Sequence, residues 1–185
     1  MLFLLKRTWI GGLLGLAGLS LLAFVLRQIV PHSFDLVLST EDVLNGLLVF
    51  SLVLLSDGTI HGLLLLTLKQ PYRDRHRELA AVFRGQTIPA ILCGALMAGI
   101  GEEMLFRGLD PGTGYLLGGA VVFGLLHHIR RELWLFTLWA VWQGSLFAAA
   151  MLYFQRLGVT MTAHFLHDLT GFLLFRYRYS VLPPR

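Results

Sequence analysis

Residues 87–109 read TIPAILCGALMAGIGEEMLFRGL, an apolar run that ends with two adjacent glutamates and an arginine. About 20 predominantly apolar residues are enough for an α-helix to span the hydrocarbon core of a bilayer. Charged side chains at membrane depth are costly and are retained there mainly for function. This stretch therefore predicts a membrane-spanning helix with part of a functional site, and its candidate residues are Glu102, Glu103 and Arg107.

The composition of the whole chain is typical of a membrane protein. Of its 185 residues, 56% are hydrophobic and 14% are charged, and the mean hydropathy is +0.70. A soluble domain has about 25% charged residues. The net charge of +4 does not indicate a nucleic-acid partner, because the basic residues lie between apolar segments rather than along one polar face. We expect one domain, residues 1–185, in a lipid bilayer, with the lone Cys93 unable to form an intramolecular disulfide.

Five further apolar segments predict membrane spans, at residues 9–26, 43–68, about 114–129, 133–154 and 159–175. Together with residues 87–109 they predict an all-α, polytopic bundle of about six transmembrane helices. The first segment is longer than the roughly 7–15-residue apolar region of a signal peptide, so we interpret it as a span. The segments at 114–129 and 159–175 are short, which predicts tilt or burial among the other helices.

The basic residues predict the orientation of the bundle. One side of the predicted topology carries only Arg27, Arg107 and Arg156, and the other carries the remaining twelve: Lys6, Arg7, Lys69, Arg73, Arg75, Arg77, Arg84, Arg130, Arg131, Arg176, Arg178 and Arg185. Lysine and arginine accumulate in cytoplasmic loops, so both termini are expected in the cytoplasm. Within the largest polar insertion, residues 77–83 predict a short surface helix near anionic headgroups, and a role in admitting substrate is the alternative.

Adjacent residues on an α-helix point about 100° apart, so Glu102 and Glu103 cannot both face one cavity. Arg107 lies four residues after Glu103, the spacing of an ion pair on one helix face. This spacing predicts that Glu103 pairs with Arg107 while Glu102 faces a cavity. A carboxylate in that position can act as a general base.

Two more polar patterns lie in apolar segments, Phe123-x-x-x-His127 and His164-x-x-x-Asp168. Residues four apart share one face of a helix. Hydrolysis of an amide needs a base that deprotonates water and groups that stabilise the oxyanion, and these side chains can supply both. We interpret His128 and His167 as supporting or interfacial residues, and Asp57 with His61 as a pair that packs helices.

In this order, Glu-Glu-x-x-x-Arg, Phe-x-x-x-His and His-x-x-x-Asp resemble the motifs of the CAAX protease and bacteriocin-processing family of glutamic intramembrane endopeptidases. The resemblance covers residues 101–168, and it implies a catalytic core at about 87–175. It implies that Glu102 activates water with the help of His127, and that His164 and Asp168 form the oxyanion hole.

The same resemblance implies a supporting role for Glu103, Arg107 and Phe123. The chain departs from the family at Asp168, where many members have asparagine. An ionised aspartate would repel an oxyanion, so Asp168 is expected either to be protonated or to orient His164.

The resemblance implies a protease without a cofactor, and we expect a multi-pass protein of a prokaryotic inner membrane. Its substrate would be a protein or peptide cut near the membrane: a CAAX-like, bacteriocin-type or C-terminal sorting-anchor segment. A zinc protease is one alternative, because Glu102, His127 and His164 are suitable zinc ligands, although His-Glu-x-x-His is absent. The second alternative is a non-catalytic immunity factor or scaffold of the same fold. The complete set of catalytic residues argues against this alternative.

Overall fold

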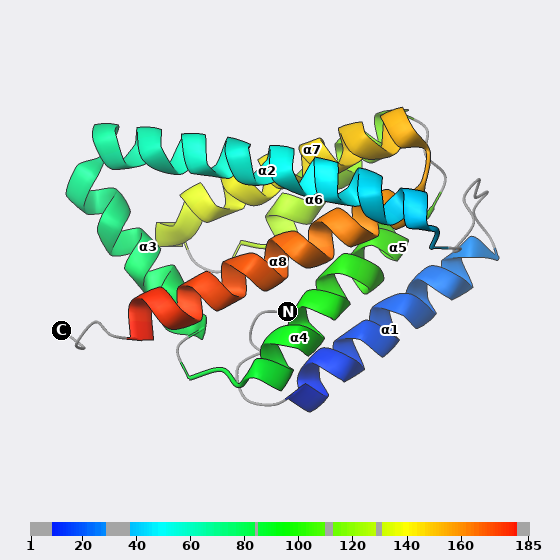
Figure 1. Ribbon diagram of the computed structural model, residues 1–185, viewed down its shortest axis with the longest axis horizontal. Coiled ribbons are helices and arrows are strands. Elements are labelled where there is room, and N and C mark those ends of the chain that lie inside the picture. Colours follow the sequence, from blue (N-terminus) through cyan, green and yellow to red (C-terminus); the bar gives the residue numbers. More distant parts are fainter. Residues whose placement is uncertain (1–8, 29–37, 84, 110–112, 129–130, 181–185) are drawn as a thin grey trace.

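The computed structural model describes residues 9–28, 38–83, 85–109, 113–128 and 131–180, and all regular elements of this part are helices (Figure 1). In chain order they are α1 (Trp9–Arg27), α2 (Thr40–Thr67), α3 (Lys69–Phe83), α4 (Ile88–Leu96), the π-helix η2 (Met97–Glu102), α5 (Glu103–Phe106), α6 (Thr113–Leu126), the 3₁₀-helix η3 (Arg131–Leu133), α7 (Trp134–Phe154) and α8 (Leu157–Ser180). This architecture confirms the all-α fold class.

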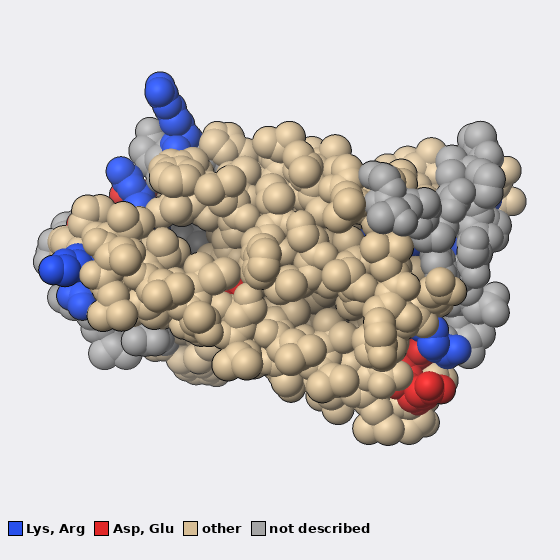
Figure 2. All heavy atoms as spheres, turned by 90° about the horizontal axis from the view of Figure 1, so that it is seen from above, with Lys and Arg blue, Asp and Glu red and all other residues tan. Residues whose placement is uncertain are grey.

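The surface of the bundle matches a lipid environment. Four stretches are long and apolar enough to cross a membrane, namely Ile10–Arg27, Thr40–Thr67, Ile88–Phe106 and Trp134–Phe154. Many large apolar side chains face outward, such as Leu55 at 68% and Leu66 at 73% exposure. Figure 2 shows charged side chains gathered at the two ends of this face, with a broad, nearly uncharged band between them. The protein is an integral membrane protein with a helical bundle.

All six predicted segments are helical, but two differ from the expected spans. Helix α6 ends at Leu126, three residues before the predicted end, and it is too short to count among the four crossing stretches. Helix α8 continues to Ser180, five residues past the predicted end. The predicted surface helix is also longer, because α3 begins at Lys69. The orientation argument also used residues 6, 7, 84, 130 and 185, which lie outside the described part.

Small residues let the helices approach closely. A Cβ atom at Gly99 of η2 would lie 2.6–2.8 Å from the Cβ, Cα and N atoms of Phe165 on α8. At Gly144 of α7 it would lie 3.1 Å from the Cα of Ala120 on α6. Close backbone contact through small residues is the usual way in which membrane helices pack. These contacts bring η2, α6, α7 and α8 together around the polar residues.

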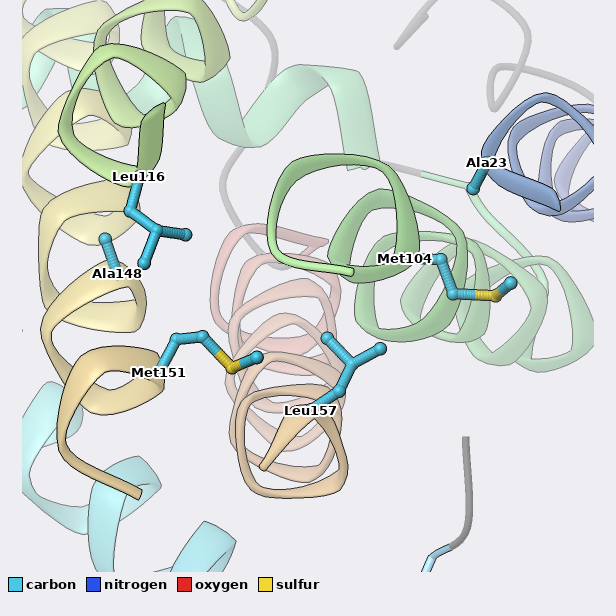
Figure 3. Close-up of a cluster of buried hydrophobic side chains, with 6 residues drawn as sticks. All are labelled: Ala23, Met104, Leu116, Ala148, Met151 and Leu157. Carbon is cyan, nitrogen blue, oxygen red and sulfur yellow. The ribbon is translucent and has the colours of Figure 1, made fainter. Parts of the chain in front are cut away.

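The apolar core at one end of the bundle joins five helices (Figure 3). Its buried side chains are Ala23, Met104, Leu116, Ala148, Met151 and Leu157. At the same end, the buried Asp42 carboxylate of α2 accepts hydrogen bonds from the Nε and NH2 atoms of Arg156, just before α8. The core and this ion pair fix the starts of α2 and α8 relative to α5.

Helices α4, η2 and α5 form one continuous rod. Its middle, Met97–Glu102, has π-helical hydrogen bonding, and Glu102 is the last residue of that part. Short π-helical insertions often occur at functional sites because they turn a side chain away from the regular helical direction. Here the insertion ends at the double glutamate.

Candidate active site

Polar residues of several helices meet at a cavity of about 380 Å³ between α2, α3, α4, η2, α6, α7 and α8. Most of its wall is apolar. Five of the seven predicted site residues line it: Glu102, Phe123, His127, His164 and Asp168. The remaining two, Glu103 and Arg107, are buried outside this lining. Segments that are distant in the sequence therefore bring their polar side chains into one chamber.

Glu102 is 2% exposed, and its Oε2 atom has no hydrogen-bond partner among the described residues. The groups that interact electrostatically with its carboxyl group are His127, His164, Asp168 and Glu103. A buried carboxyl group without a dedicated partner is unusual, because desolvation costs free energy that a hydrogen bond normally offsets. Glu102 is thus a candidate general base at the cavity.

Glu103 and Arg107 form a buried ion pair. The NH1 atom of Arg107 donates to the Oε1 atom of Glu103 at 2.7 Å, and NH2 donates to the carbonyl oxygen of Gly144 at 2.9 Å. The guanidinium carbon lies 5.2 Å from the ring centroid of Phe123 and 5.8 Å from that of Phe147. Arg107 therefore connects α5 to α6 and α7 and compensates the charge of Glu103.

His127 directly follows the end of α6 and lines the cavity. Its Nδ1 atom lies 2.7 Å from the carbonyl oxygen of Phe123. A carbonyl only accepts, so Nδ1 donates, and the neutral ring carries its lone pair on Nε2. The ring also packs on Phe123 with centroids 4.4 Å apart. These contacts fix the tautomer and leave Nε2 for chemistry.

His164 has a carboxyl group near each of its ring nitrogens. Nδ1 lies 2.7 Å from the Oε1 atom of Glu103, and Nε2 lies 3.8 Å from the Oδ1 atom of Asp168. The ring stacks on Phe147 with a centroid distance of 4.7 Å and an angle of 22°. Glu103 therefore has two partners, Arg107 and His164, and its contact with His164 was not expected from the sequence.

Asp168 belongs to a second polar group. Its Oδ1 atom lies 3.1 Å from the Nδ1 atom of His167, whose Nε2 atom lies 2.8 Å from the Oδ2 atom of Asp57 on α2. Two imidazole rings therefore neighbour this carboxyl group, in addition to its apolar surroundings.

Sequence reasoning missed several residues of this site. It assigned Asp57 to helix packing with His61, whereas Asp57 lines the cavity and contacts α7 and α8. Gln143 and Phe147 of α7 also line the cavity, and no sequence pattern marked them. Polar residues in the apolar segment 133–154 are few, so the buried Gln143 was the available signal.

His61 and His128 lie in different surroundings. The Nδ1 atom of His61 is 2.7 Å from the hydroxyl oxygen of Tyr72 on α3, and its ring packs against His76. The Nδ1 atom of His128 is 3.0 Å from the hydroxyl oxygen of Thr137. Of the two, only His61 lines the cavity. Among the described residues, no group of three His, Cys, Asp or Glu side chains has the arrangement of a metal site.

Comparison with known proteins supports the resemblance. Residues 84–170 match the model of a family described as type II CAAX prenyl endopeptidase Rce1-like. The matched segment includes all three motifs, from Glu102 to Asp168, and it agrees with the predicted resemblance for this part of the chain. Comparison with the curated proteins and with the solved structures found no match.

Proposed function

From the match of residues 84–170 to the Rce1-like CAAX prenyl endopeptidase family, we propose that the protein is an intramembrane endopeptidase of the glutamic type. The match supports a peptide hydrolase of the membrane in general. The finer assignment is that Glu102 activates water, without a metal cofactor, to cleave a protein or peptide at the cavity.

The observation that carries this proposal is the state of Glu102. Its carboxyl group lines the cavity, and its Oε2 atom has no hydrogen-bond partner among the described residues. The Oε2 atom of Glu103 has none either, but the Oε1 atom of Glu103 contacts both Arg107 and His164. A group that only stabilised the fold would be expected to have partners, as Glu103 does. A general base needs an available oxygen next to its substrate.

The reaction follows from the tautomer of His127. A water molecule between Glu102 and the Nε2 lone pair of His127 is polarised by both groups. Glu102 takes one of its protons while the oxygen attacks the carbonyl carbon of the peptide bond. When the tetrahedral intermediate collapses, the carbon–nitrogen bond breaks and Glu102 returns the proton to the leaving amine.

His164 stabilises the oxyanion in this scheme. Its Nδ1 atom already donates to Glu103, so Nε2 can donate only when the ring is protonated. Carboxyl groups lie next to both nitrogens, Glu103 at 2.7 Å and Asp168 at 3.8 Å, and they are the natural partners of a protonated imidazole. A preorganised donor of this kind is worth about 10²–10³ in turnover.

The surroundings of the cavity suggest how substrate enters. Its wall extends from Glu102 to His61 of α2, His76 of α3 and Phe175 of α8. Helix α3 carries Arg73, Arg75 and Arg77, and the positive-inside rule places such a helix on the cytoplasmic face. We therefore assign substrate entry to the α3 end, in a multi-pass protein of a prokaryotic inner membrane. A C-terminal membrane-anchored segment fits an apolar cavity next to lipid.

Mass spectrometry of peptide products tests the function. The purified protein in liposomes is incubated with a library of synthetic peptides, and new termini are identified. Glu102→Gln keeps the size of the side chain but removes the base, and it should lower product formation by at least about 100-fold. Glu41→Gln changes an exposed glutamate of α2 and is the matched control. Near wild-type cleavage by Glu102→Gln would reject the mechanism, and no cleavage by the wild type would favour the non-catalytic alternative.

A further inference from the structure

Asp57 is an acidic residue of α2 that lies outside the segment matched by the family. It is 8% exposed and lines the cavity. Its Oδ1 atom accepts hydrogen bonds from Trp139 at 3.0 Å and from the amide nitrogen of Gln143. Its Oδ2 atom faces His167 at 2.8 Å. The Asp57 carboxylate thus contacts side chains of both α7 and α8, on the side of the cavity where Asp168 lies.

The direction of these hydrogen bonds follows from the donors. An indole N–H and an amide NH₂ only donate, so Asp57 acts as the acceptor at Oδ1. An ionised Asp57 also accepts at Oδ2, which requires that the Nε2 atom of His167 carries a hydrogen. The opposite nitrogen of the same ring, Nδ1, lies 3.1 Å from the Oδ1 atom of Asp168.

One proton then lies between His167 and Asp168. If it is on Nδ1, the ring is protonated and Asp168 is a carboxylate. If it is on Oδ1, the ring is neutral and Asp168 donates to His167. In both cases this proton is used within the pair and does not reach an oxyanion. The Oδ1 atom of Asp168 is therefore taken up by His167, and the same atom lies 3.8 Å from the Nε2 atom of His164.

We propose that Asp57 and His167 are positioning residues of the active site, which hold the Asp168 carboxyl group against His164. This inference rests on the proposed function and adds α2 to the machinery of the reaction. Asp57 anchors the ring of His167, His167 engages Oδ1 of Asp168, and Asp168 fixes the ring that stabilises the oxyanion. Neither positioning residue touches the reacting atoms.

The competing explanation is that Asp57 only ties α2 to α7 and α8. A purely structural role would affect thermal stability and would not depend on Asp168. The positioning role predicts a loss of kcat that disappears once Asp168 is changed, because residues of one network show coupled effects.

The experiment measures kcat, KM and the melting temperature of His167→Phe, Asp168→Asn and the double variant, with a peptide that the wild type cleaves. His167→Phe keeps an aromatic ring in place but removes both nitrogens. We expect kcat to fall about 10- to 100-fold with KM within about threefold, and the double variant to be no slower than Asp168→Asn alone. Independent losses that multiply in the double variant would overturn the proposal, as would a wild-type kcat for His167→Phe.

Asp57→Asn is the second variant, because it keeps an acceptor for Trp139 and Gln143 and so preserves the contact to α7. Asp57→Asn should reduce kcat in the wild-type background, and it should not reduce the kcat of Asp168→Asn further. If His167→Phe does not fold, this second variant tests the proposal. Tyr72→Phe is the matched control. It removes a hydrogen bond between α3 and His61, which lies on α2 like Asp57, and it should keep the wild-type kcat. If the wild type cleaves no peptide, the proposed function itself fails; if it cleaves and the coupling is absent, only this inference fails.

Discussion

Replacing Arg107 by alanine should destabilise the bundle more than it changes the chemistry. The side chain is 1% exposed, and it supplies one of the two hydrogen bonds to Oε1 of Glu103 and one to the carbonyl oxygen of Gly144. Arg107→Ala leaves the Glu103 charge with His164 as its remaining partner. Removing one member of a buried ion pair costs about 3–5 kcal/mol. For a chain of this size, about 2–4 °C per kcal/mol converts that cost into a fall of the melting temperature on the order of 10 °C.

Tryptophan fluorescence of the protein in one detergent, recorded during heating, measures this shift. Arg75→Ala is the matched control, because Arg75 forms a salt bridge with Glu78 at 3.2 Å but both side chains are about 40% exposed. An exposed pair contributes about 0–1 kcal/mol, so the control should melt within a few degrees of the wild type. If Arg107→Ala melts like the control and is nevertheless inactive, Arg107 acts in the reaction and the structural role is wrong.

Three further results are expected. EDTA or phenanthroline should leave peptide cleavage intact, and a loss that added zinc restores would support the zinc alternative. Gly99→Ala should lower the melting temperature and kcat, because its Cβ would meet the backbone of α8 at 2.7 Å, whereas Gly18→Ala has nothing within 4 Å and should behave like the wild type. The variant Arg73→Cys should react with an impermeant maleimide only after spheroplasts are opened, whereas Leu38→Cys should react in intact spheroplasts. The reverse pattern would contradict the proposed orientation.

The sequence was sufficient for the parts of the site that lie on single helices. Glu103 and Arg107 are four residues apart, and the ion pair that this spacing predicts is present. Phe123 and His127 share a face in the same way, with their rings in contact. The apolar segments predicted the helices with small errors at their ends. Helical periodicity shows which residues lie on the same side of one helix. The Glu103–Arg107 and Phe123–His127 contacts follow from this periodicity alone.

The depth of His127 could not be derived from the sequence. An apolar run up to residue 129 suggested a helix that crosses the membrane, and this would place His127 far from Glu102. In the structure α6 runs from Thr113 to Leu126, and His127, directly after it, lines the cavity together with Glu102. Hydropathy therefore reports the environment of a segment, and it does not report where its helix ends.

Contacts between helices were the other missing information, and they decide how Asp168 is interpreted. From α8 alone, this aspartate has apolar neighbours and one histidine a turn away, and either a protonated donor or an orienting carboxylate is compatible with that pattern. The choice depends on Asp57, which is 110 residues from His167 in the sequence. Asp57 accepts from two obligate donors of α7 at its Oδ1 atom, and its Oδ2 atom lies 2.8 Å from His167. His167 in turn contacts the Oδ1 atom of Asp168. In the proposed arrangement, a helix outside the motif thus positions this residue of the motif.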